Sequence, residues 1–312
     1  MQKTGAIRFA LFRLLAAVPT LLLVIAIAFT MVRLAPGGPF DDERRLPPEI
    51  RDNVERYYHL DEPLPVQFGR YLAGLARGDL GPSYRYRDRD VDELIAATLP
   101  ATLALGLLAM LLALAVGMPA GIAAALHHGG LRDRLLSGIA ISGISLPVFV
   151  FAPVLVLFFA VWGGWLPASF SGSSGPARYL LPVVALALPQ VAYIMRLMRA
   201  SMLEVLASDY VRTARAQGLP TRRIVTRHAL KPALLPLLSY MGPAIAGVLT
   251  GSVVVEQIFG VPGLGRLFVT GAENRDYTLV LGIVIFYAAL VIVLNLLVDI
   301  LYGFLDPRIR QR

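Results

Sequence analysis

The 312-residue chain is too apolar for an ordinary soluble domain, since 56% of its residues are hydrophobic and its mean hydropathy is +0.66. Soluble domains have about 45–50% apolar residues, so the excess indicates membrane-spanning segments. The formal charge of +8 does not indicate nucleic-acid binding here, because the arginines lie mostly at the ends of apolar runs, where they set membrane orientation. Cysteine is absent, which excludes disulfides, thiolate chemistry and cysteine metal sites.

Several apolar stretches reach the roughly 20 helical residues that a bilayer core requires. They are residues 12–32, 98–126, 135–162, 179–202, 233–258 and 279–304. The first stretch follows basic residues, as the apolar region of a signal peptide does. Its apolar part is too long for that region, however, and no small-x-small cleavage site follows. We therefore interpret it as a retained span. The sequence predicts an all-α polytopic membrane protein with six transmembrane helices.

The charge of the short loops predicts the orientation, because Lys and Arg are enriched on the cytoplasmic side. Loop 127–134, loop 203–232 and the C-terminal tail are basic, whereas 163–178 and 259–278 have few or balanced charges. We therefore expect both termini in the cytoplasm. The long 33–97 segment is expected outside, since long loops translocate largely regardless of charge.

The segment 33–97 also has helical signals of its own. Pro47-Pro48 predicts a helix to about Tyr58, and Pro65 begins a second one. One apolar stripe of the second consists of Leu64, Phe68, Tyr71 and Leu75. The stripe favours a small external cap packed on the bundle; direct contact with a substrate stays open as an alternative.

Prolines and glycines recur inside the predicted spans. They are Gly117, Pro119, Gly121, Pro147, Pro153, Pro189, Pro243 and Gly247. Broken helices of this kind can line a pathway, or they can be ordinary kinks and close-packing sites. The sequence leaves both interpretations open.

No pattern of an enzyme is present: the chain lacks H-E-x-x-H, G-x-S-x-G and the P-loop motif. We expect no catalytic, cofactor-binding or metal site, and the adjacent His127 and His128 are expected to point to different faces of a helix or to lie in a loop. Ionisable residues near the span ends are expected to snorkel or to pair between helices. These are Arg196, Arg199, Glu204, Glu256 and Asp299.

The stretch DYVRTARAQGLPTRRIVTRHALKPALLP, from Asp209 onward, is dense in arginine between two spans. Ser208 or Asp209 is a plausible N-cap, and Tyr210 to Gln217 favours a short helix that ends at Gly218. A second helix is expected from about Thr221 into the next span. Such a break predicts a rigid ledge on the membrane surface, although a basic loop lying on anionic lipid stays open.

Ala214-x-x-x-Gly218 resembles the EAA loop of ABC-importer permeases, with Arg212-Thr213-Ala214 where the family has Glu-Ala-Ala. Segments 31–40, 57–84, 251–282 and 297–310 also resemble the B-type permease subunits of bacterial oligopeptide and dipeptide importers, which are binding-protein-dependent transport permeases. This resemblance implies a type I ABC importer permease fold, and it implies that the protein is located in the bacterial cytoplasmic (inner) membrane. Its parts are 1–32 with the first span, the external 33–97, and the core 98–312 with a coupling loop at about 203–232.

The resemblance implies that the chain forms half of the pathway of an ATP-driven peptide importer and is not itself an enzyme. Its partners would be a homologous second permease, two cytoplasmic P-loop ATPases that bind ATP and Mg, and an external peptide-binding protein. The residues implied in ATPase coupling are Asp209, Tyr210, Arg212, Thr213, Ala214, Gln217 and Gly218. Of these, Ala214 is expected to present a small contact to the ATPase. A self-sufficient secondary carrier and a related permease for nickel or another small solute remain alternatives.

Overall fold

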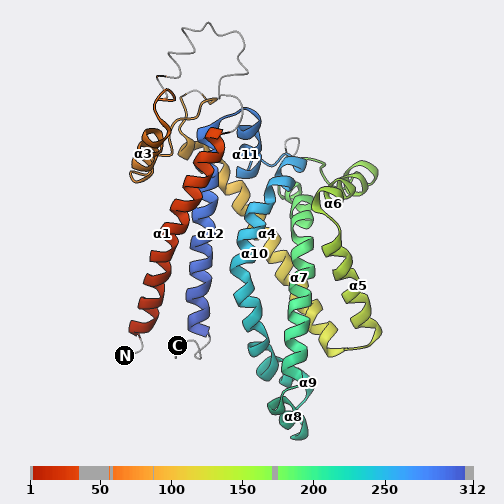
Figure 1. Ribbon diagram of the computed structural model, residues 1–312. Helices are drawn as coiled ribbons and strands as arrows, with labels where there is room; N and C mark the ends of the chain where they lie inside the picture. The colour runs from red at the N-terminus through yellow and green to blue at the C-terminus, as the bar shows by residue number, and fades with distance from the viewer. Residues whose placement is uncertain (1–2, 35–55, 57–58, 87, 171–174, 306–312) are drawn as a thin grey trace.

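The computed structural model describes residues 3–34, 56, 59–86, 88–170 and 175–305, and these form a bundle of tilted helices (Figure 1). Within this part, five helices are long and apolar enough to cross a membrane, and there are up to six spans if a bent pair counts as one. The five correspond to predicted spans. They are α1 (Lys3–Leu34), α4 (Val91–Leu126), α7 (Leu180–Leu206), α10 (Leu230–Phe259) and α12 (Tyr277–Leu305).

The segment predicted as one span at 135–162 is not a continuous helix. α5 (Leu131–Ser145) is bent by 105° from α6 (Val148–Leu155) and the π-helical turn η1 (Val156–Trp162) that continues it. Pro147 explains the break, because proline lacks an N–H and disfavours the helical conformation at the preceding residue. Leu146 is accordingly extended, with φ −88° and ψ 117°.

Close packing of α4 on α7 depends on two glycines. A Cβ at Gly117 would lie 2.8 Å from the carbonyl oxygen of Val191, and one at Gly121 would lie 2.5 Å from that of Met195. Small residues allow membrane helices to approach in this way. Gly117 and Gly121 are therefore packing residues, whereas Gly247 on α10 is exposed and has open space at its Cβ position.

Short helices lie at the two ends of the bundle (Figure 1). At one end are α3 (Leu64–Leu75) and α11 (Leu264–Glu273); at the other are α8 (Asp209–Ala216) and α9 (Thr221–Arg223). α9 continues through the π-helical turn η3 (Ile224–Ala229) into α10, and the 3-10 turn η2 (Pro176–Tyr179) precedes α7. α8 lies at the end where α1 begins and α12 finishes, which agrees with the common side that the loop charges predict.

α3 is the helix that the apolar stripe predicts. Phe68, Tyr71 and Leu75 pack against buried side chains of α1 and α12, whereas Leu64 is exposed. The helix predicted between Pro47 and about Tyr58 lies almost wholly outside the described residues.

Glu256, near the end of α10, is fully buried, and its carboxylate accepts four hydrogen bonds. The hydroxyls of Thr102 and Ser252 donate to Oε1 at 2.9 and 2.8 Å. The backbone N–H groups of Gly265 and Arg266 donate to Oε2 at 2.7 and 3.1 Å. A carboxylate can be buried where donors replace water. Glu256 thus joins the first turn of α11 to α10 and α4 instead of snorkelling.

Asp276 is the second fully buried acid at this end. It accepts hydrogen bonds from the Ser83 hydroxyl and from the backbone N–H groups of Tyr84 and Leu279, the latter two at 3.2 Å. It therefore caps the first turn of α12 and fastens the segment before α4 to it.

Candidate coupling surface

α8 is a two-turn helix whose limits follow from local chemistry. Ser208 precedes it in an extended conformation, with φ −69° and ψ 153°, and Asp209 adds negative charge to its first turn. Gly218 follows it with φ +78°, in the left-handed region that favours glycine. The predicted helix and its stop at Gly218 are both confirmed.

The inner face of α8 packs on the chain itself. Val211 and Ala214 are buried with Ile224 of η3, and Leu219 packs beside them. Ala214 is only 6% exposed. We expected from the sequence that Ala214 would present a small contact to the ATPase. Its side chain instead faces inward, because its position three residues after Val211 places it on the same face of the helix. Its role is to hold α8 on η3.

The outer face of α8 is open. The other residues predicted to couple are all exposed: Asp209, Tyr210, Arg212, Thr213, Gln217 and Gly218. Arg212 Nη1 lies 3.3 Å from Asp209 Oδ1, but both side chains are mostly exposed and such pairs contribute only about 0–1 kcal/mol. The side chains of this face are thus available to a partner. Arg222 and Arg223 in α9 are also exposed and extend the basic surface.

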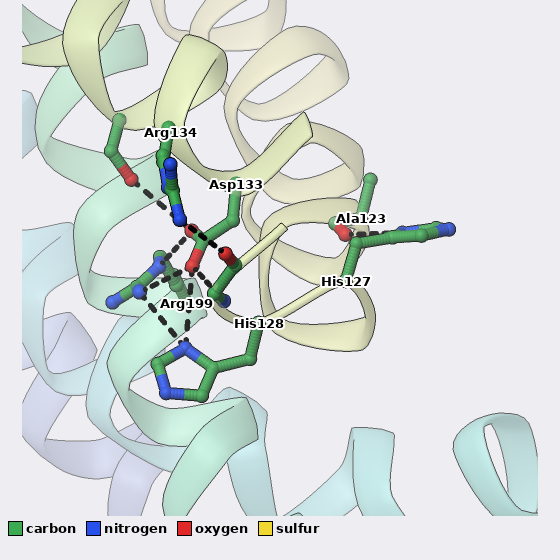
Figure 2. Close-up of polar contacts among 8 residues, drawn as sticks. Ala123, His127, His128, Asp133, Arg134 and Arg199 are labelled. Atoms are coloured by element: carbon green, nitrogen blue, oxygen red, sulfur yellow. Dashed lines mark hydrogen bonds and ion pairs between the residues drawn. The ribbon is translucent and has the colours of Figure 1, made fainter. Parts of the chain in front are cut away.

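An ion pair between a half-buried arginine and a buried aspartate fixes the turn between α4 and α5 to α7, which leads into α8. Arg199 Nε and Nη2 donate to the two carboxylate oxygens of Asp133 at 2.6 and 2.8 Å (Figure 2). Asp133 also accepts the Gly129 N–H at 2.9 Å, and His128 Nδ1 lies 3.2 Å from it. A bidentate pair of this kind defines one geometry. It ties the start of the bent segment to α7.

The two adjacent histidines point in different directions, as expected (Figure 2). His127 Nδ1 lies 2.9 Å from the Ala123 carbonyl oxygen of its own helix, whereas His128 faces Asp133. They do not converge on one point.

Among the ionisable residues near the span ends, Arg199 forms the interhelical pair that was one of its two expected roles. Its partner Asp133 stands 66 residues earlier, so no local spacing in the sequence indicates it. Arg196 and Glu204 are exposed on α7 and make no ion pair with any described residue. The side chain of Asp299 lies outside the described part.

These features define a multi-pass helical membrane protein with a surface helix held rigidly at one end of its bundle. The family described as "Binding-protein-dependent transport system inner membrane component" matches residues 117–311. The chain belongs to this family, which makes it a membrane component of a transport system and not an enzyme.

Curated relatives match nearly the whole chain. It is 50% identical over 305 residues to the "Oligopeptide transport system permease protein OppB" of Haemophilus influenzae, covering 97% of this chain and 99% of the relative. The protein of the same name from Escherichia coli K12 is 51% identical over 304 residues, with the same coverage. The "Dipeptide transport system permease protein DppB" of Bacillus subtilis is 39% identical over 303 residues, covering 97% of this chain and 98% of the relative.

A solved structure of the MetNI methionine ABC transporter, in inward-facing conformations, has a similar chain. The TM-score is 0.56 at 19% identity, and the likeness covers 68% of this chain and 96% of that one. At this identity the likeness concerns the fold alone. It confirms the predicted ABC-importer permease fold.

Proposed function

We propose that this chain is one of two homologous permease subunits of an ATP-driven oligopeptide importer in a bacterial inner membrane. Support comes from 50% identity to a relative named for oligopeptide transport, over 97% of the chain. The α8 end of the bundle lies in the cytoplasm, because the basic short loops are on that side. An external binding protein delivers the peptide to the opposite end.

α8 is the element that docks on a cytoplasmic ATPase, and ATP and Mg²⁺ are bound by two such partner subunits. The observation that carries this assignment is the combination of an exposed outer face with an inner face buried on η3. η3 continues without a break into α10, and α7 leads into α8 from the other side. A displacement of α8 is therefore passed to two spans, which allows ATPase closure to drive alternating access.

The experiment replaces Gly218 by Val. A β-branched residue at φ +78° is strained by about 1–3 kcal/mol, which displaces α8 without adding a clash, since nothing lies within 4 Å of the Cβ position. Gly164 is the matched control, because it has φ +62° and equally open space, and it lies in the segment before α7, whereas α8 follows the other end of that helix. In reconstituted complexes, Gly218→Val should retain assembly but lose ATPase stimulation and peptide uptake. Gly164→Val should retain all three.

A second variant tests the support of α8 from inside. Ala214→Glu places a carboxylate in the small core with Val211 and Ile224 and should detach α8, whereas Ala214→Ser should be tolerated. If Gly218→Val and Ala214→Glu both import like the unmodified complex, α8 is not the coupling element. If the purified chain exchanges solute without ATPases, it is a secondary carrier.

A further inference from the structure

The exposed faces of the long helices are of two kinds. On α4 the exposed side chains include Leu107, Leu108, Leu111 and Val116, as expected for contact with lipid. Over residues 193–200 of α7 and 239–247 of α10 the exposed side chains are instead polar, aromatic or small, whereas the exposed apolar Leu180 and Val254 lie outside these stretches. The exposed residues of the two stretches are Tyr193, Arg196 and Ala200 on α7, and Ser239, Pro243 and Gly247 on α10.

The geometry places both exposed faces on one side. On α7, the residues that contact the α4 glycines are Val191, Ile194, Met195 and Met198. At about 100° per residue, Tyr193, Arg196 and Ala200 lie on average about 180° from these contacts.

On α10 the residues that meet α4 include Leu249, which contacts Gly106, and Glu256, which bonds Thr102. The same rotation places Ser239, Pro243 and Gly247 about 90°, 130° and 170° from the mean direction of these two contacts, so the helix face turns progressively away from α4. α4 passes behind α7 and α10 in Figure 1, and the opposite faces of this pair are exposed over the described residues.

The contact between α7 and α10 contains aromatic and polar side chains that interact with one another. The rings of Tyr193 and Tyr240 stack with centroids 4.4 Å apart and an interplanar angle of 20°. The Tyr240 hydroxyl donates to Gln190 Oε1 at 2.7 Å. Tyr193 is nevertheless 48% exposed, so the aromatic pair presents one ring outward beside an amide.

Such a face is unsuited to lipid. An arginine near a span end can snorkel to the membrane surface, but Arg196 shares its helix face with the exposed Tyr193, and charged residues in spans otherwise face a protein interior or a water-filled cavity. Arg196 has no ionic partner among the described residues that would neutralise it. We infer that this face, centred on Tyr193, Arg196 and Ser239, lines the aqueous path along which the peptide passes. This inference rests on the proposed function.

The chemistry of the face fits a peptide of variable sequence. An exposed aromatic ring and a hydroxyl offer stacking and hydrogen bonds that do not depend on one side chain, and Arg196 offers a cation for the terminal carboxylate. Gly247 continues the face without a side chain, which leaves room for bulky residues. Weak contacts distributed along a path permit both entry and release.

Single cysteines provide the test, because the chain has no native cysteine. Tyr193→Cys and Ser239→Cys are placed in the complete complex in lipid nanodiscs, where both membrane sides are accessible. A charged methanethiosulfonate reagent should label both, and peptide import in proteoliposomes should then fall at least tenfold. Leu111→Cys, on the lipid-type face of α4, should react only with a lipophilic maleimide, and import should remain.

Two results would overturn the inference while leaving the proposed function intact: import-competent variants that the charged reagent does not label, or labelling that leaves import unchanged. If the two cysteines are protected from the charged reagent and can be cross-linked to the second permease, this face is a dry subunit interface instead. If the unmodified complex imports no peptide although both cysteines are labelled, the proposed function fails and the aqueous face remains. A further test needs no labelling. Ser239→Trp places a bulky side chain on the proposed path and should block import, whereas Leu111→Trp, on the lipid-type face of α4, should not.

Discussion

The fully buried carboxylate of Glu256 should be one of the most sensitive groups in the molecule. Glu256→Ala removes the acceptor of four donors at once. Glu256→Gln keeps the shape and still offers one oxygen, which can turn toward the two backbone N–H groups of α11. Its NH₂ group then faces the hydroxyls of Thr102 and Ser252, which can rotate to accept.

The magnitudes follow from this difference. The N–H groups of Gly265 and Arg266 cannot move to another acceptor without unwinding α11, and each buried unsatisfied donor costs about 1–3 kcal/mol. Glu256→Ala should therefore cost about 2–6 kcal/mol from these two groups, and the buried Thr102 hydroxyl, which also loses its acceptor, adds to this cost. Ser252 already bonds the Leu249 carbonyl at 2.8 Å, so its hydroxyl remains satisfied. Glu256→Gln loses only the charged character of the hydrogen bonds and should cost about 1–2 kcal/mol.

The assay is unfolding of the purified chain in mixed micelles with increasing SDS, followed by circular dichroism. The midpoint should fall in the order unmodified, Gln, Ala, with most of the loss at the second step. Equal loss for both variants would show that the charge matters and the bonding geometry does not. A neutral Glu256→Ala would refute the assignment of this carboxylate as the fastening point of α11.

Two further predictions concern the other end and the orientation of the bundle. Arg199→Gln removes the cation from the Asp133 carboxylate, which keeps the Gly129 N–H as a donor, so it should destabilise the chain by about 1.5–3 kcal/mol. The double variant with Asp133→Asn should lose less than the sum of the two single variants. An additive result in the same SDS titration would contradict the pairing. In intact cells, Thr221→Cys should react with an impermeant maleimide only after the membrane is opened, whereas Asn274→Cys should react from outside; external labelling of Thr221→Cys would reverse the proposed orientation.

The parts of the structure that were predictable from sequence are those encoded locally. α8 and its stop at Gly218 depend on neighbouring residues, and the long apolar runs each exceed the bilayer thickness. Pro147 is visible in the sequence, but hydropathy averages across it, so the 105° bend was not predicted. Such a break can be predicted only if the helix-breaking effect of the proline is considered separately from the mean hydropathy of the stretch that contains it.

The residues that sequence could not place depend on the tertiary arrangement. Asp133 finds Arg199 across 66 residues because α4 and α7 pack closely, and no spacing rule connects them. Ala214 belongs to a motif, yet which way a two-turn helix faces depends on what lies beneath it, here Ile224. Glu256 stands near a span end in the sequence, but the return of α11 over it makes it fully buried.

η3 gives the chain a property that no single side chain supplies. A π-helical turn contains one residue more than an α-helix needs, and one residue corresponds to about 100° of rotation and 1.5 Å of rise. The turn absorbs this extra residue, so deleting one residue within Ile224–Ala229 would restore the regular repeat and leave α8 facing nearly the same way, whereas deleting a second residue would rotate α8 around the axis of α10 by about that angle. The number of residues in this turn thus sets the direction in which α8 faces, and that direction can change only in whole-residue steps. Insertions and deletions here, more than substitutions, would change which face α8 presents.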